Sequence, residues 1–180
     1  VIAGRPSMGK TSLAMNIVES VVLDSKLPAA VFSMEMPSEQ LAMRMISSLG
    51  RIDSHKVRTG DLKDDDWPRL TSAVGLLSEV KMFIDDTAAL TPGDLRSRCR
   101  RIAREQGLGL VVIDYLQLMR LERMGNREQE VANASRELAT LASELDIVLF
   151  DLCQLNRQLE QRPLRDRRRG ARHAQRRRCA

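Results

Sequence analysis

The chain of 180 residues has the composition of a soluble globular protein, with 43% hydrophobic and 29% charged residues. It has no run of 18 apolar residues, which excludes a transmembrane helix, and we expect no signal peptide and no membrane partner. The formal net charge of +5 is uneven, because nine arginines and one aspartate in residues 162–180 leave residues 1–161 with a formal charge of −3. The overall charge therefore does not predict a basic partner-binding surface.

The three cysteines, Cys99, Cys153 and Cys179, are odd in number and widely separated, and they form no Cys-x-x-Cys pair. His55 and His173 do not complete a metal-binding spacing with them. The pattern excludes a disulfide scaffold and a zinc site, and it favours reduced thiols in a cytoplasmic protein. We interpret His55 as a surface residue.

The first motif along the chain is Gly-x-x-x-x-Gly-Lys-Thr, from Gly4 to Thr11. Residues 1–3 resemble the end of a buried strand, and residues 11–22 form a mostly apolar helical segment. This context predicts a P-loop, in which Gly4 and Gly9 let successive backbone N–H groups point at phosphate oxygens. An ordinary glycine-rich turn would not explain the Lys-Thr pair that follows Gly9.

A P-loop implies ATP and Mg²⁺ as cofactors. We expect Lys10 to contact the β- and γ-phosphates and to act in catalysis, and the Thr11 hydroxyl to bind Mg²⁺. The start of a helix near Lys10 adds the favourable end of its dipole. The predicted nucleotide-binding residues are Gly4, Arg5, Pro6, Ser7, Met8, Gly9, Lys10, Thr11 and Ser12.

The rest of the chain alternates between short apolar runs and segments with helical periodicity, such as the four-residue spacing of Leu41, Met45 and Leu49. We expect Ser38 to cap one helix and Gly107 to follow the end of another. The predicted elements are a strand at 29–34, a helix at 38–49, an irregular segment at 51–63, a helix at 64–77, a strand at 82–84, a helix at 91–104, a strand at 110–113, a polar loop at 120–127, a helix at 128–145 and a strand at 147–152.

Strands that alternate with helices predict an α/β fold with a mostly parallel sheet covered by helices on both faces. Ligands of such sheets bind at the carboxyl ends of the strands. We expect one domain over residues 1–161 that is truncated at both ends. Residues 162–180 have almost no apolar side chains, which predicts a disordered tail.

A triphosphatase also needs a carboxylate at the end of a buried strand, in the magnesium shell. Asp114 follows four consecutive aliphatic residues, whereas Asp85 and Asp86 follow a shorter run. We therefore assign Asp114 to the metal shell, directly or through water, and interpret Asp85 and Asp86 as turn or helix-start residues.

Two further side chains are candidates for the hydrolytic step. Glu35 follows the strand at 29–34 and would lie near the phosphates if that strand neighbours the P-loop strand; it is either the base for the attacking water or a solvent-exposed edge residue. Gln154 could donate a hydrogen bond to the γ-phosphate, although an amide after a strand is usually a turn residue.

Arg127 is a candidate DNA contact from its loop position alone, and a solvated arginine is the preferred interpretation.

Together, these motifs resemble the RecA-like ATPase domain of the DnaB family of replicative DNA helicases. The likeness extends almost without a break from residue 1 to about residue 162. The segments that carry it are 4–11, Phe-Ser-Met-Glu-Met-Pro-Ser-Glu-Gln at 32–40, 58–60, 84–86, 96–104, Ile-Asp-Tyr-Leu-Gln-Leu-Met at 113–119 and Gln-Leu-Asn-Arg at 154–157.

The resemblance implies a cytoplasmic homohexamer that couples ATP hydrolysis to 5′–3′ movement on single-stranded DNA and to duplex unwinding, with a primase and a helicase loader as partners. It assigns Glu35 to water activation, Asp114 to the magnesium sphere and Gln154 to sensing of the γ-phosphate. It also implies an arginine finger donated by a neighbouring subunit.

The family pattern is lost after Arg162, where a DNA-contacting loop, further strands and the arginine finger would follow. Our hypothesis is that the reading frame shifts near residue 163. We expect this chain to bind ATP with little or no unwinding. Two alternatives remain: a RecA-like recombinase or switch ATPase, and a non-hydrolysing nucleotide-binding module whose basic tail binds nucleic acid.

Overall fold

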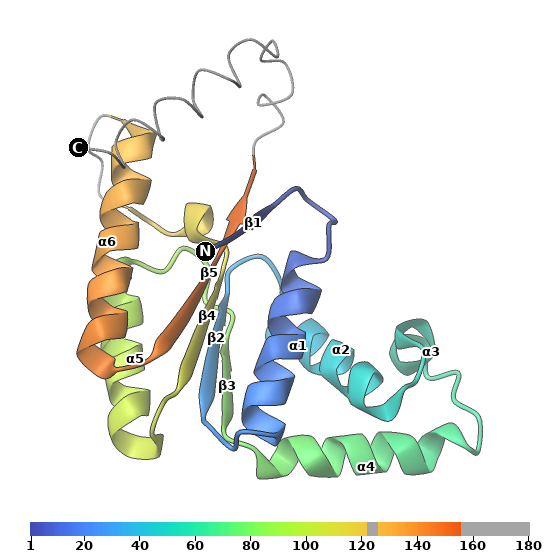
Figure 1. Cartoon of the computed structure of the whole chain (residues 1–180). Helices are drawn as coiled ribbons and strands as arrows, with labels where there is room; N and C mark the ends of the chain where they lie inside the picture. The colour runs from blue at the N-terminus through green and yellow to red at the C-terminus, as the bar shows by residue number, and fades with distance from the viewer. Residues whose placement is uncertain (122–125, 156–180) are drawn as a thin grey trace, which may run out of the picture.

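The structure, a computed structural model, describes residues 1–121 and 126–155 (Figure 1). Strands and helices alternate along the chain, as the sequence predicts. The strands are β1 (Ile2–Gly4), β2 (Ala29–Ser33), β3 (Met82–Asp85), β4 (Leu110–Asp114) and β5 (Val148–Gln154). The helices are α1 (Lys10–Leu23), α2 (Ser38–Gly50), α3 (Ser54–Thr59), α4 (Asp66–Glu79), α5 (Pro92–Gln106), the 3₁₀ turn η1 (Leu116–Leu118) and α6 (Arg127–Leu145).

The described strands form one sheet in the order β1-β5-β4-β2-β3, and every pair is parallel. The α/β prediction with a parallel sheet is confirmed. Each strand is joined to the next by a helical connection, so all carboxyl ends meet at the same edge of the sheet. The candidates Gly4, Asp114 and Gln154 are the last residues of β1, β4 and β5, and Glu35 follows the end of β2, so they lie at this edge.

Helices cover both faces of the sheet (Figure 1). One core joins α1 and α2 to strand residues such as Val31 and Val112, and the other joins α5 and α6 to Phe32 and Ile113. Neighbouring residues of one strand therefore belong to different cores, because side chains alternate between the faces of a strand. β2 and β4 are buried along their whole length, which explains their unbroken apolar sequences.

Two local predictions are wrong. Residues 51–63 are not all irregular, because α3 begins after Asp53, whose carboxylate accepts a hydrogen bond from the backbone of His55. Ser38 is the first helical residue of α2 rather than its cap. Its backbone N–H donates to Asp86, 2.8 Å away, so a carboxylate distant in sequence replaces the local cap.

The boundary between the domain and its basic tail stays a prediction, because residues 156–180 lie outside the described part of the chain. Among the described residues, no helix has the length and apolar character that a membrane span requires.

Candidate functional site

The P-loop connects the end of β1 to the start of α1. Gly4 is the last residue of β1, and Gly9 lies at the N-cap of α1 with φ of 78°. Ser7 also has a positive φ, of 61°. Left-handed residues within a tight connection turn successive N–H groups toward one side, which is the backbone arrangement that binds anions. α1 supplies additional unpaired N–H groups from its first turn.

Lys10 lies over the carbonyl groups of its own loop. Its Nζ donates to Gly4 O at 3.0 Å and to Arg5 O at 2.8 Å. A Cβ at Gly4 would lie 3.2 Å from Cγ and Cδ of Lys10, which is closer than ordinary contact. Glycine at position 4 therefore lets the lysine stem cross the end of β1.

Thr11 and Asp114 are in direct contact, with the Thr11 Oγ1–H donating to Asp114 Oδ2 at 2.6 Å. Asp114 is the last residue of β4 and is 2% exposed. Its other carboxylate oxygen, Oδ1, is buried and has no hydrogen-bond partner in the described structure. A carboxylate oxygen that lacks a partner, next to a hydroxyl, matches the hard oxygen ligands that Mg²⁺ takes. These two residues could hold that ion.

Glu35 does not reach the site by the predicted route. β2 lies beside β3 and β4, and it is separated from β1 by β4 and β5. The link is instead through Asp114, because Ser33 pairs with Asp114 in the sheet and Met34 N donates to Asp114 O at 2.8 Å. The turn after β2 leaves the Glu35 side chain exposed, where it lines a cavity together with Lys10 and Thr11 of the P-loop; we call this the phosphate cavity.

Tyr115 lies close to these carboxylates. Burial raises the pKa of its phenol, and the negative charges of Glu35 and Asp114 raise it further. Its aromatic ring packs into the core on the α1 side. The phenol therefore stays protonated beside two acids. The sequence analysis did not select Tyr115 as a neighbour of the site.

Gln154 ends β5 and pairs in register with Gly4 of β1. Side chains alternate along β5, so Gln154 faces the same side as the fully buried Leu152, which is the side of α1. The amide therefore borders the P-loop, and it lies within β5 rather than after the strand, where the sequence analysis placed it.

Most of the candidates line one cavity of about 380 Å³, although Gly4, Arg5, Met8 and Asp114 are not among its lining residues. Its residues come from the P-loop, the start of α1, the turn after β2, the middle of α2 and the end of β5. The lining residues are Pro6, Ser7, Gly9, Lys10, Thr11, Ser12, Glu35, Met36, Arg44 and Gln154. Arg44 was missed by the sequence analysis; an arginine six residues into a helix carries no local signal of a phosphate site.

Asp85 and Asp86 have structural partners, in agreement with the turn interpretation. Burial raises the pKa of Asp85, but hydrogen bonds from Thr87 and the Arg98 guanidinium outweigh it and lower the pKa below its ordinary value. The hydrogen bond from the backbone N–H of Ser38 likewise lowers the pKa of Asp86 below its ordinary value.

Arg127 begins α6 rather than lying in a loop, so its expected position is corrected; residues 122–125 are outside the described structure. His55 is exposed, as expected.

In the described part of the chain, no group of three or more histidine, cysteine or acidic side chains could hold a metal. Asp114 would therefore depend on phosphate, hydroxyl and water oxygens to complete a magnesium shell.

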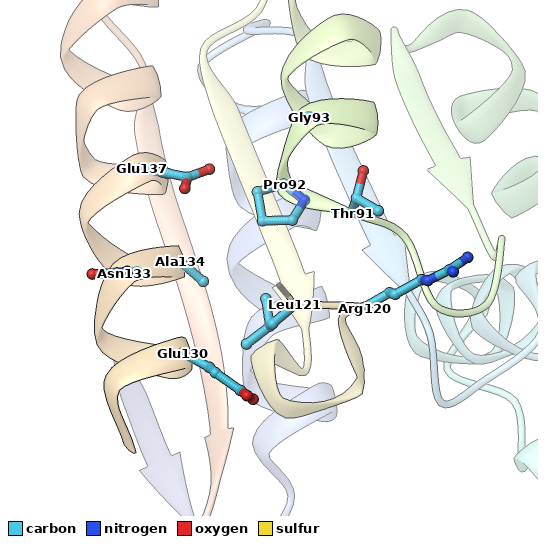
Figure 2. Close-up of a pocket in the computed structure, with 9 residues that line it drawn as sticks. All are labelled: Thr91, Pro92, Gly93, Arg120, Leu121, Glu130, Asn133, Ala134 and Glu137. Atoms are coloured by element: carbon cyan, nitrogen blue, oxygen red, sulfur yellow. The ribbon is translucent and has the colours of Figure 1, made fainter. Parts of the chain in front are cut away.

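A second hollow of about 340 Å³ lies on the other side of the sheet, between α6 and the start of α5 (Figure 2). Glu130, Ala134 and Glu137 border it from α6, and Pro92 faces them from α5. The other lining residues are Thr91, Gly93, Arg120, Leu121 and Asn133. This hollow shares no residue with the phosphate cavity, and no motif in the sequence predicts it.

Comparison with known proteins yields a family match. The family described as DnaB-like helicase C terminal domain matches residues 1–169. The replicative DNA helicase DnaB of Buchnera aphidicola subsp. Baizongia pistaciae is 52% identical over 171 residues, which is 93% of this chain. The same helicase of Haemophilus influenzae is 50% identical over 166 residues, or 90% of this chain. The chain spans 36% of the length of each relative.

Two solved structures have the same fold. One, described as an ATPase domain, is 34% identical, with a TM-score of 0.82 over 89% of this chain and 58% of that one. The other, a DnaB-like replicative helicase studied with its interactions with primase, is 34% identical with a TM-score of 0.82, over 89% of this chain and 39% of that one. These similarities agree with the RecA-like fold that the sequence analysis expected.

Proposed function

Because this chain belongs to the DnaB-like helicase C-terminal domain family, we propose that it is the ATP-hydrolysing motor domain of a replicative DNA helicase. One observation carries the proposal: Thr11 of the P-loop donates a hydrogen bond to Asp114, the buried acid at the end of β4. The P-loop and the carboxylate at the end of β4, distant in sequence, are thus in contact, which supports a Mg²⁺–ATP site here. The proposal gives ATP and Mg²⁺ as cofactors.

Nucleotide binding is assigned to the P-loop. The backbone N–H groups around Ser7 and Gly9 would bind phosphate oxygens, and Lys10 would exchange its carbonyl partners for the β- and γ-phosphates. Thr11 and Asp114 would hold Mg²⁺, which when bound offsets the phosphate charge. Arg5, Pro6, Met8 and Ser12 complete the proposed binding loop.

Hydrolysis is assigned to Glu35 and Gln154. Glu35 would accept a proton from the attacking water as the new P–O bond forms and the bond to the β–γ bridging oxygen breaks. Gln154 would donate a hydrogen bond to the γ-phosphate. Support comes from the cavity, which Glu35 and Gln154 line together with Lys10 and Thr11.

The partners are proposed from the family. We propose a cytoplasmic homohexamer on single-stranded DNA, with 5′–3′ movement, a primase and a loader, and with an arginine finger between subunits. Arg127 remains a candidate DNA contact. This chain has an arginine-rich sequence after residue 162 where the resemblance implies the finger and the DNA loop. We therefore propose that it binds ATP with little or no unwinding.

The test measures nucleotide affinity, steady-state ATP hydrolysis with and without single-stranded DNA, and strand separation. Lys10→Ala should weaken Mg²⁺–ATP binding by roughly 100-fold, because charge-assisted contacts to phosphate are lost. Glu35→Gln should keep the ATP affinity within about threefold while it lowers any hydrolysis by about 100-fold or more.

The outcomes separate the alternatives. DNA-stimulated hydrolysis that Lys10→Ala abolishes supports a motor, and tight binding with no turnover supports a nucleotide-binding module. Unchanged ATP affinity in Lys10→Ala would overturn the assigned site. Unwinding by the purified chain would contradict the proposed inactivity.

A further inference from the structure

Gln117 has a contact that its place in the sequence does not explain. It lies in η1, three residues after Asp114, and it does not line the phosphate cavity. Its side-chain Nε2 donates to Gln154 O at 3.3 Å, and its Oε1 accepts from Gln154 N at 3.4 Å. One amide therefore makes paired hydrogen bonds to the backbone of Gln154, whose side chain lines the phosphate cavity.

The reason is the unequal length of the two strands. β4 ends at Asp114, which pairs with Leu152, whereas β5 continues to Gln154. The backbone N–H and C=O of Gln154 would otherwise lack a partner at the β4 side of the sheet. A glutamine amide offers one donor side and one acceptor side, like a peptide group, so Gln117 extends the ladder by one position.

The opposite side of β5 joins the P-loop. Gly4 pairs with Gln154, and Leu155 N donates to Gly4 O at 3.1 Å. The same carbonyl oxygen accepts from Lys10 Nζ at 3.0 Å. A continuous set of hydrogen bonds therefore runs from the Gln117 amide through the end of β5 to the P-loop lysine.

We propose that Gln117 is a positioning residue, which fixes the end of β5 so that the Gln154 side chain faces the γ-phosphate. The inference rests on the proposed function, because it requires a nucleotide in the cavity of Lys10 and Gln154. Gln117 acts through Gln154 and does not touch substrate. Without it, the end of β5 loses its support on one side and the sensing amide loses its fixed direction.

The test compares the affinities of the chain for ADP and for a non-hydrolysable ATP analogue, each with Mg²⁺. Gln117→Ala should reduce the preference for the triphosphate by about tenfold, because the proposed hydrogen bond from Gln154 to the charged γ-phosphate is lost. The ADP affinity should stay within about twofold, because ADP has no γ-phosphate. Gln117→Glu keeps the shape and the acceptor but loses the donor, so it should also reduce the preference. Gln106→Ala, an exposed residue at the far end of α5, is the control.

A double variant tests the route. If Gln117 acts through Gln154, adding Gln117→Ala to Gln154→Ala should not reduce the triphosphate preference further. Additive losses would overturn the inference, as would an equal loss of affinity for both nucleotides, which marks a merely structural role. An unchanged preference in Gln117→Glu would also overturn it, even if Gln117→Ala does not fold.

Failure of the proposed function gives a different result. If Lys10→Ala binds both nucleotides as the unchanged chain does, the phosphate site itself is wrong. If Lys10→Ala loses binding while Gln117→Ala keeps the full triphosphate preference, only the role of Gln117 is overturned. Equal affinities of the unchanged chain for the two nucleotides would overturn both the role of Gln154 and that of Gln117.

Discussion

Thr11 and Asp114 are hydrogen-bonded across 103 positions of sequence, with 2.6 Å between Oγ1 and Oδ2. Thr11 is the second residue of a largely apolar helix, and Asp114 follows four aliphatic residues within β4. A buried carboxylate with one oxygen left without a partner is costly unless something binds it. The contact and the unpartnered oxygen therefore support the Mg²⁺ site that we propose here.

Asp114→Asn tests this site. The amide can still accept the Thr11 hydrogen bond, so the fold should persist, but it carries no charge for a cation. We expect Mg²⁺-dependent ATP affinity to fall by roughly 10- to 100-fold, with little change when Mg²⁺ is chelated. Calorimetric titration in both conditions measures this, and Asp64→Asn, at an exposed turn, is the control. An equal loss with and without Mg²⁺ would contradict the metal role.

The P-loop glycines serve different purposes, and substitution separates them. A Cβ at Gly4 would displace Lys10, so Gly4→Ala should weaken ATP binding with little effect on unfolding. At Gly9 nothing lies within 4 Å of a Cβ, but φ is +78°. Gly9→Ala should therefore lower the free energy of unfolding by about 1–2 kcal/mol through backbone strain.

Gly75→Ala is the matched control for both glycines. Gly75 lies inside α4 without a positive φ, and a Cβ there meets nothing within 4 Å. Alanine should stabilise the chain by roughly 0.5–1 kcal/mol, because it restricts the unfolded backbone and favours the helix. Chemical denaturation measures all three variants. A Gly9→Ala variant as stable as the unchanged chain would contradict the strain argument.

Local sequence signals predicted the strands, the helices other than α3 and η1, and most of the candidate site. Each strand was a short apolar run, and the P-loop and Asp114 were recognisable because their spacing and their position after a strand are local properties. The order of strands is not local. In the sheet, β4 and β5 lie between β1 and β2. Glu35 therefore lines the cavity because the chain after β2 is bonded to Asp114, and not because β2 neighbours the P-loop strand.

Residues whose contacts lie on other elements were missed for the same reason. The polar surroundings of Tyr115, Arg44 and Gln117 arise only when α2, η1 and the strand ends meet. The cap of α2 likewise comes from Asp86, on the segment after β3, and not from Ser38 itself. Periodicity and capping rules describe neighbours within a few positions, so they cannot identify partners that folding brings together.

Arg44 is the cation of the cavity that sequence patterns did not identify. If it contacts the triphosphate, Arg44→Ala should weaken ATP binding by about tenfold or more, because a charge-assisted hydrogen bond is lost. Arg44→Lys should restore part of the affinity, since the charge remains without the planar donors. Arg104→Ala, exposed near the end of α5, is the control for a lost surface charge. An ATP affinity in Arg44→Ala equal to that of the control would exclude the contact.

Asp151 is a buried carboxylate outside the phosphate cavity. It lies within β5, is 4% exposed, and its Oδ1 has no hydrogen-bond partner in the described structure. Burial raises the pKa of Asp151 from its ordinary 3.8 to about 6, although the Cys153 thiol, 3.7 Å from Oδ2, opposes this by donating a hydrogen bond. Between about pH 4 and pH 6, the Asp151 carboxyl therefore keeps its proton in the folded chain and loses it in the unfolded chain.

The consequence for stability follows from this proton. Between about pH 4 and pH 6 the folded state binds more protons than the unfolded state, so the free energy of unfolding falls as the pH rises and levels off above about pH 6. The total effect is on the order of 3 kcal/mol. Asp151→Asn removes this titration. The melting temperature of the variant minus that of the unchanged chain should therefore be larger at about pH 8 than at about pH 5. Asp146→Asn, at an exposed helix end, should show no such rise, and a rise shared by both variants would assign the effect to general surface charge.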